Sequence, residues 1–224
     1  MEPIYIHRGF SLIELVVAAA IISVIALIVI TNQSSFNNST ELANAAYDVA
    51  LSVRSAESYG LGSRVSGAGV SNAGFGIHFP QTPTNTYMLF SDVNSPSSSS
   101  CHGIPTGETA AAPDAQYGDC VYQSSEKVSS YTLGNGITIS GVCIYQAGSG
   151  VCHPVNSGDG TLDIVFARPN PDVFFSTGGT YSATPVIRSA CITLSTQSRA
   201  HRYVSVTQYG AVLASATPCN GSGD

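Results

Sequence analysis

The sequence predicts an α+β protein, in which a long N-terminal hydrophobic helix packs on a C-terminal antiparallel β-sheet domain. Two patterns predict this class. Residues 10–30 are apolar or small apart from one carboxylate, and residues 31–60 continue with the period of a helix. From Phe75 onward, apolar and polar residues alternate with period two, and turn signals such as Asn135-Gly136 interrupt them.

The apolar segment 10–30 is long enough for a transmembrane helix. At about 1.5 Å per residue, roughly 20 residues cross the hydrocarbon core of a bilayer. His7 and Arg8 precede the segment, and no Lys or Arg follows until Arg54. By the positive-inside rule, we expect the N-terminus in the cytoplasm and the rest of the chain outside. Glu14 is the one charge in the segment, and such a carboxylate needs compensation.

Residues 31–60 predict an amphipathic continuation of the helix. Residues 31–39 are polar, and they either interrupt the helix or extend it beyond the membrane, without a proline to kink it. An apolar stripe then recurs at helical spacing, at Leu42, Ala46, Val49, Val53 and Ala56. Gly60 and Gly62 end the helix. We expect the stripe to pack against the sheet of the domain.

Residues 61–224 predict one β-rich domain with an irregular insertion. The candidate strands share the period-two pattern, and they are Gly76–Phe79, Thr86–Ser91, Val128–Leu133, Ile137–Tyr145, Thr161–Ala167, Val186–Ser195 and Tyr203–Ala214. Residues 94–119 are rich in Ser, Ala, Pro and Gly, which indicates a surface insertion. The composition does not decide whether this insertion binds a partner or is only a stabilised loop.

The six cysteines all follow the apolar segment, on the side expected to be outside: Cys101, Cys120, Cys143, Cys152, Cys191 and Cys219. An even number in an exported domain predicts disulfides formed in an oxidising compartment. Among the many pairings, we favour sequence neighbours, namely Cys101–Cys120, Cys143–Cys152 and Cys191–Cys219. Histidines follow Cys101 and Cys152, but the spacings fit no usual zinc site. We therefore expect no metal and no cofactor.

The chain carries no motif of an enzyme. The five histidines are scattered, at His7, His78, His102, His153 and His201. There is no G-x-S-x-G or H-E-x-x-H motif and no phosphate-binding glycine loop. We therefore predict a non-enzyme with surface histidines. The formal net charge of −6 argues against general affinity for nucleic acid, which needs a basic face.

The N-terminal segment Gly9-Phe10-Ser11-Leu12-Ile13-Glu14-Leu15 resembles the prepilin signal of the type IV pilin family, which includes the pseudopilins of type II secretion. The resemblance implies that residues 1–9 are a leader, which a prepilin peptidase removes by cutting between Gly9 and Phe10. It also implies methylation of the new N-terminus at Phe10. Glu14 would then pair with an N-terminal amine, its own or a neighbour's, in the core of a filament.

The C-terminal strands resemble the GspH/FimT group of minor pilins and pseudopilins, whose domain ends in a V-x-V-x-x-x-G-x-[VI] pattern. Val204, Val206, Gly210 and Val212 fit it. Some FimT-like minor pilins bind DNA through basic residues of this region. The corresponding candidates are Arg188, Arg199 and Arg202, although three arginines on an acidic domain favour a solvated surface.

The two resemblances together imply a minor pilin or pseudopilin of a type IV pilus or a type II secretion pseudopilus. The implied partners are prepilin peptidase, other pilin subunits, the inner-membrane assembly platform and, before assembly, the membrane itself. The subunit would begin as a single-pass protein of the cytoplasmic membrane and end in an extracellular or periplasmic filament. Three alternatives stay open: a major pilin, a DNA-uptake minor pilin, and a membrane-anchored adhesin or binding domain that never polymerises.

Overall fold

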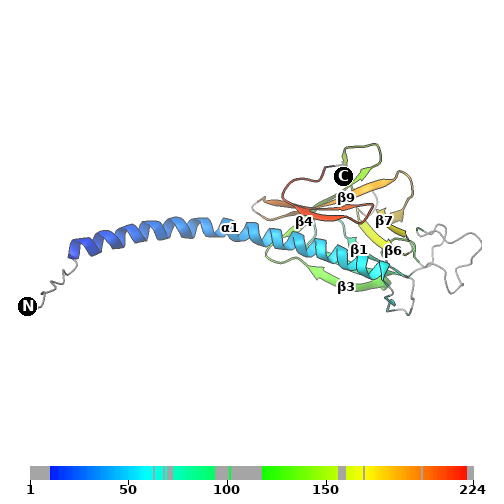
Figure 1. Ribbon diagram of the computed structural model, residues 1–224, viewed down its shortest axis with the longest axis horizontal. Helices are drawn as coiled ribbons and strands as arrows, with labels where there is room; N and C mark the ends of the chain where they lie inside the picture. The colour runs from blue at the N-terminus through cyan, green and yellow to red at the C-terminus, as the bar shows by residue number, and fades with distance from the viewer. Residues whose placement is uncertain are drawn as a thin grey trace, which may run out of the picture. The chain divides into compact units, whose positions relative to one another are not determined.

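The computed structural model (Figure 1) describes residues 11–62, 64–67, 69, 73–93, 101, 118–155, 160–168, 170–197 and 199–220, without the side chains of 29–36, 170 and 171. The chain divides into two compact units, Met1–Thr40 and Glu41–Asp224. The first unit is helical where described. The second contains the rest of the helix and both β-sheets, so the predicted α+β class is confirmed.

Helix α1 (Leu12–Leu61) contributes to both units, and its backbone is helical through residues 31–39. Of the two alternatives for that polar stretch, the structure has the extension. The helix ends where the glycines predict, and the N–H of Gly62 donates to the carbonyl of Ser58 at 3.0 Å. Gly60 packs so closely on the sheet that a Cβ there would collide with the backbone carbonyl of Phe166.

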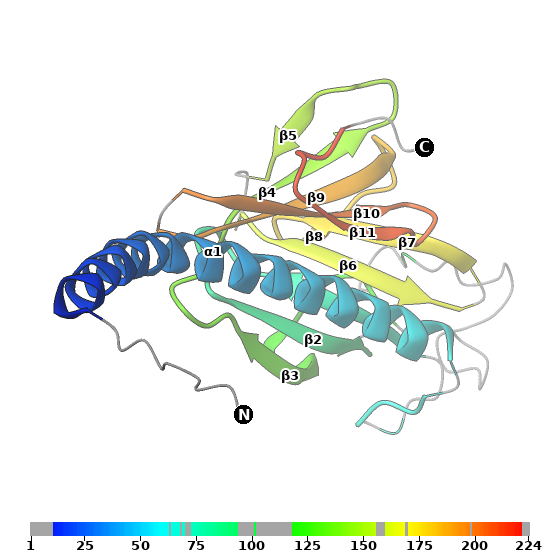
Figure 2. The ribbon, with the colours of Figure 1, turned by 60° about the vertical axis from the view of Figure 1, so that its left-hand side comes forward.

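The strands form two antiparallel sheets (Figure 2). The order in the six-stranded sheet is β3 (Lys127–Thr132), β2 (Thr86–Asp92), β1 (Gly74–Phe79), β6 (Leu162–Ala167), β7 (Asn170–Thr177) and β8 (Thr180–Tyr181). The order in the five-stranded sheet is β11 (Val212–Ser215), β10 (His201–Thr207), β9 (Ile187–Ser195), β4 (Thr138–Gln146) and β5 (Cys152–Pro154). A short 3-10 helix, η1 (Ser124–Glu126), precedes β3.

The predicted strand Tyr203–Ala214 was wrong as a single element, because a turn divides it into β10 and β11. Gly210 forms this turn with a φ of +81°, a conformation that glycine adopts readily. Three further strands have no counterpart in the prediction. β5 and β8 are too short for a periodic pattern. β7 begins with Asn170-Pro171, a pair that indicates a turn.

One hydrophobic core joins the second part of α1 to the inner faces of both sheets. The predicted stripe of five residues on α1 is buried in it, and Leu42, Val49 and Val53 are fully buried. From the sheets come Ile77 and Phe166 on one side and Ile192 and Val204 on the other, among other residues. Figure 2 shows α1 passing in front of β2 and β6. The predicted packing of the helix stripe on the sheet is confirmed.

Each outer sheet face carries a smaller cluster that includes a disulfide. Phe90 and Val165 pack with Cys101 and Cys120 on the six-stranded sheet. Cys143, Tyr145 and Cys191 form the cluster on the five-stranded sheet. The structure contains the disulfides Cys101–Cys120, Cys143–Cys152 and Cys191–Cys219, with Cα–Cα distances of 5.8, 5.6 and 6.1 Å. These are the pairs of sequence neighbours that the spacing favours.

Candidate functional site

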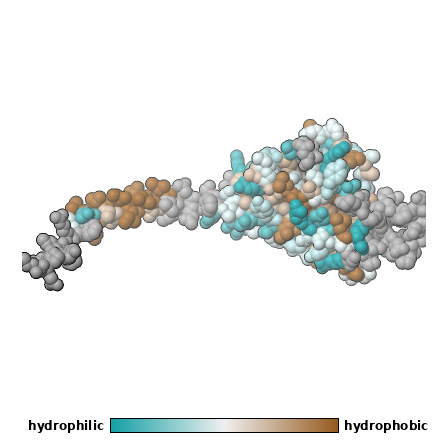
Figure 3. All heavy atoms as spheres, viewed as in Figure 1, coloured by the Kyte–Doolittle hydropathy of each residue, from teal (hydrophilic) through white to brown (hydrophobic). Residues whose placement is uncertain are grey.

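Residues 11–28, the part of the first unit whose side chains the structure describes before residue 37, present a largely apolar helix surface. All described side chains of residues 11–28 are exposed, and Figure 3 shows this segment as a hydrophobic surface. Leu12 is the most exposed large apolar residue in the part of the chain that the structure describes, at 82% exposed. Ser23 does not interrupt this surface, because its hydroxyl donates to the carbonyl of Ala19 at 2.8 Å. A helix that is apolar all round is typical of one buried among other helices or in lipid.

Glu14 is the one charged residue of this described segment, and it lies in the first turn of α1. The partial positive charge at a helix N-terminus stabilises a carboxylate there. Gly9 and Phe10 lie outside the described residues, so their roles in cleavage and methylation stay predictions. No helix in the described part of the chain combines the length and the apolar character that crossing a membrane requires.

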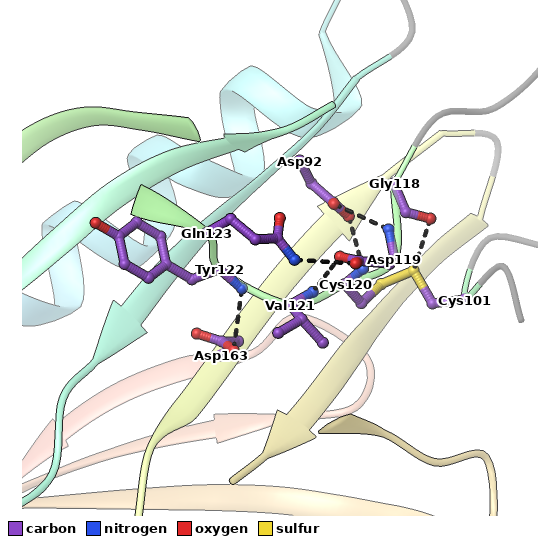
Figure 4. The surroundings of a disulfide bond; sticks show 9 residues. All are labelled: Asp92, Cys101, Gly118, Asp119, Cys120, Val121, Tyr122, Gln123 and Asp163. Carbon is purple, nitrogen blue, oxygen red and sulfur yellow. Dashed lines mark hydrogen bonds between the residues drawn. A yellow bond between two sulfur atoms is a disulfide. The ribbon is translucent and has the colours of Figure 1, made fainter. Parts of the chain in front are cut away.

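A second polar site lies on the outer face of the six-stranded sheet, where the segment 118–126 crosses it. Four carboxylates hold the backbone of this segment, and we call them the carboxylate clasp: Asp92, Asp119, Glu126 and Asp163. Asp92 is fully buried, and Glu126 and Asp163 are 2% and 1% exposed. Figure 4 shows Asp92 and Asp119 beside the Cys101–Cys120 disulfide, and Asp163 beside Tyr122.

The clasp accepts hydrogen bonds from five consecutive backbone N–H groups, those of residues 119–123. Asp92 accepts those of residues 119 and 120 at 3.0 and 2.9 Å. Asp119 accepts that of residue 121 at 3.0 Å. Asp163 accepts that of residue 122 at 3.2 Å, and Glu126 that of residue 123 at 3.0 Å. Because buried N–H groups need acceptors, the carboxylates replace a strand partner for this irregular segment.

Asp163 also accepts a hydrogen bond from His78, with Nδ1 of His78 2.6 Å from Oδ1 of Asp163. Tyr122 stacks on the His78 ring, with ring centroids 4.2 Å apart. Burial raises the pKa of the Asp163 carboxyl above its ordinary value of 3.8, and the hydrogen bond from His78 opposes this shift in part. The predicted surface position of His78 was wrong, whereas His153 and His201 are exposed as expected.

A serine, an aspartate and a histidine are neighbours in the six-stranded sheet, but in the wrong order for catalysis. Ser176 lies opposite Asp163, which in turn lies opposite His78, so all three share one face of the sheet. In a nucleophilic triad the histidine stands between the serine and the carboxylate. Here the carboxylate stands between, and Ser176 is only 1% exposed. The cluster therefore serves structure, and it offers no nucleophile to a substrate.

One group of possible metal ligands occurs among the described residues, formed by Asp92, Cys101 and Cys120. Both sulfurs belong to a disulfide, and both Asp92 oxygens accept backbone N–H groups. A disulfide sulfur is not the thiolate that binds metals. This group is therefore unsuited to a metal ion.

The three arginines considered for DNA contact do not form one patch. Arg188 lies beside Ser189, which pairs with Thr207 at one end of the β9–β10 hairpin. Arg199 and Arg202 lie at the other end, where Ser195 pairs with His201. At about 3.3 Å per residue, the two ends are roughly 20 Å apart. The three arginines therefore lie along the β9–β10 hairpin without forming one patch, and a role in DNA contact stays a prediction.

The clasp is the feature that the sequence analysis missed, and the sequence does hold a signal for it. Asp163 interrupts the otherwise apolar run of β6, and Asp92 ends β2. The structure adds Gly118 to this set, because its φ is +126° and a Cβ there would collide with the Asp92 carboxylate. An isolated carboxylate in an apolar strand predicts a nearby set of buried donors.

The family model of the prokaryotic N-terminal methylation motif matches residues 6–30. No curated protein and no solved structure matches the chain. The match includes Gly9, Phe10 and Glu14, and it confirms the family resemblance of the N-terminal segment. The resemblance of the C-terminal strands to the GspH/FimT group stays a prediction.

Proposed function

We propose that this chain, whose methylation motif at residues 6–30 supports a place in the type IV pilin and pseudopilin family, is a minor subunit of a pilus or of a secretion pseudopilus. The motif match carries the proposal, because the matched segment includes the predicted cleavage site, the predicted methylation site and the apolar helix. Such a subunit is a structural protein, in agreement with the inaccessible Ser176 and its unsuitable neighbours.

Processing and assembly follow from the chemistry of the N-terminus. Prepilin peptidase cuts after Gly9, and the new amine at Phe10 is methylated. Glu14 is four residues further on, so one helical turn separates the carboxylate from the amine. In an apolar filament core each charge is costly alone and much less costly when paired. Glu14 therefore selects the register in which it meets an N-terminal amine.

The apolar surface of residues 11–28 supports the rest of the pathway. Before assembly, lipid covers this surface, and in the filament the helices of other subunits cover it. Apolar side chains are kept from water throughout, so the transfer exposes little hydrophobic surface. The inner-membrane assembly platform is the proposed site of transfer. The three disulfides agree with a domain on the oxidising side of the membrane.

A minor subunit is favoured over a major pilin by its long insertion and six cysteines, which indicate a specialised surface. A DNA-uptake role has less support, since Arg188 lies far from Arg199 and Arg202. A membrane-anchored adhesin that never polymerises is the alternative of another class. It requires no cleavage after Gly9 and no methyl group on Phe10.

Mass spectrometry of the N-terminus tests the proposal. The chain is isolated from cells with and without the cognate prepilin peptidase, and a variant with Gly9→Val serves as the uncleavable control. We expect a chain that begins at methylated Phe10 only when the peptidase is present and Gly9 is intact. An intact leader in every sample would refute the pilin assignment and favour the anchored adhesin.

A further inference from the structure

A groove lies on the outer face of the five-stranded sheet, opposite the shared core. Strands β9, β10 and β11 form its floor, and the C-terminal residues 217–220 form one wall. Figure 2 shows the chain running from β11 toward the C-terminus. The groove has a volume of about 340 Å³. Sites for small molecules commonly measure about 300–1,000 Å³.

The strand register places polar side chains in rows across the floor. Thr207 lies opposite Ser189, and Tyr203 lies opposite Ser215, so each pair points to the same side of the sheet. Ser205 also lines the groove. The wall adds a hydroxyl and an amide from Thr217 and Asn220, and none of the lining residues is charged.

Two floor hydroxyls have unused hydrogen-bonding capacity. Ser189 is 5% exposed, and it lines the groove. Within the part of the chain that the structure describes, neither its hydroxyl nor that of Ser205 has a hydrogen-bond partner. A serine hydroxyl both donates and accepts. A ligand with hydroxyl groups of its own would satisfy both capacities.

The wall is fixed to the floor before any ligand arrives. The Cys191–Cys219 disulfide joins β9 to the wall. The hydroxyl of Tyr145 donates to the carbonyl of Cys219 at 2.7 Å, and the N–H of Thr217 donates to the Ser215 hydroxyl at 3.0 Å. A rigid site loses little conformational entropy on binding, so weak individual contacts suffice for specific recognition.

The lining determines the class of ligand. An anion would lack a cationic partner in the groove, and a cation would lack a carboxylate. A peptide strand would need a free strand edge, whereas the floor presents side chains. The hydroxyls beside the Tyr203 ring and the exposed Leu213 suit a molecule with many hydroxyls and one apolar face. We propose that this groove binds a neutral saccharide, with Ser189 and Ser205 as hydrogen-bonding partners.

Saturation-transfer NMR on the full chain tests the proposal, in a detergent without a sugar headgroup. The probes are neutral tetrasaccharides of hexoses and of N-acetylhexosamines, and the best binder is then titrated. We expect Ser189→Ala and Ser205→Ala each to raise its Kd roughly threefold to tenfold, which is the effect of one neutral hydrogen bond. Ser195→Ala is the matched control, since Ser195 is on the same strand and face but outside the groove.

Two results would overturn this proposal: no tetrasaccharide receives saturation, or Ser189→Ala and Ser205→Ala leave the Kd of the best binder unchanged. Stronger binding of an anionic saccharide of equal length would also overturn it, because the groove has no cation to favour one. The proposal does not rest on filament assembly. All measurements use the unassembled chain, so their failure leaves the proposed pilin function unaffected.

Discussion

Asp163 is a residue whose ionisation is linked to folding. Its folded pKa is raised above the ordinary value of 3.8 by burial, despite the hydrogen bond from His78. A raised carboxyl pKa contributes stability that is fully present below the unfolded pKa and is lost as the pH rises through the folded pKa. Folding therefore disfavours the ionised form of Asp163 relative to its protonated form.

We expect Asp163→Asn to gain stability relative to the parent chain as the pH rises from about 4 toward neutrality, because the variant has no charge to bury. Urea unfolding of both chains at several pH values gives the difference in unfolding free energy. Asp48→Asn, at an exposed position of α1, is the control for the effect that removing any one negative charge has on the unfolding free energy. A difference between the two chains that is constant across the pH range would contradict the prediction.

Gly118 is the residue on which the clasp geometry depends. A φ of +126° is strained for other residues, and a Cβ would collide with the Asp92 carboxylate. We expect Gly118→Ala to lower the unfolding free energy by about 1–3 kcal/mol. Gly141→Ala is the control, because a Cβ at Gly141 meets nothing within 4 Å, and its effect should stay within about 0.5 kcal/mol. Equal effects in chemical denaturation would argue against the steric explanation.

Glu14 is the residue that separates a pilin from a simple anchor. We expect Glu14→Leu to lose incorporation into filaments, because no carboxylate then meets the N-terminal amine in the apolar core. Processing and membrane association should be retained. Sheared filaments and membranes are compared by immunoblot, with Glu14→Asp as the charge-retaining variant. Normal incorporation of the leucine variant would contradict the pairing role.

At the scale of elements, the helix stripe was predictable because two sheets bury one side of α1 and leave the other exposed. Six predicted strands agree with β1, β2, β3, β4, β6 and β9 within two residues at each end. The failures have local causes. β5 and β8 are held by their neighbours in the sheet, so their own sequences carry no periodic pattern. The formation of these two strands therefore depends on pairing with their neighbours in the sheet and not on their own sequences.

Leu42 and Leu51 allow this burial argument to be tested on one helix. Leu42 is fully buried in the shared core, whereas Leu51 is 63% exposed. We expect Leu42→Ala to lower the unfolding free energy by about 2–5 kcal/mol, through lost apolar contacts and the cavity left behind. Leu51→Ala should change it by less than about 0.5 kcal/mol. Similar losses for both variants in urea unfolding would contradict the observed orientation of the helix.

Of the candidate site, only the N-terminal motif could be predicted from the sequence. The clasp could not, because its residues are far apart in the chain. The N-terminal motif is local, so adjacent residues in the sequence identify it. The clasp brings together Asp92, Glu126 and Asp163 from separate strands and a turn, and only the fold makes them neighbours. His78 was misplaced for the same reason, since its partner lies 85 residues away.

For the whole domain, each disulfide restricts the unfolded chain by an amount that depends on its loop. The sequence separations are 28 for Cys191–Cys219, 19 for Cys101–Cys120 and 9 for Cys143–Cys152. Replacing both cysteines of a pair by alanine should lower the unfolding free energy by about 2–4 kcal/mol. The longest loop should exceed the shortest by roughly 1 kcal/mol. The reverse order in denaturant titrations would show that native contacts outweigh loop entropy.

The three disulfide loops follow one another along the chain, and none encloses another. A protease outside the cell that cuts within a loop therefore opens a ring and releases no fragment. The predicted surface insertion between Cys101 and Cys120 would gain most from this arrangement, since surface insertions attract such cuts. A nicked subunit would keep both halves joined by the bond between these two cysteines. Its N-terminal helix would stay attached to the domain that it supports.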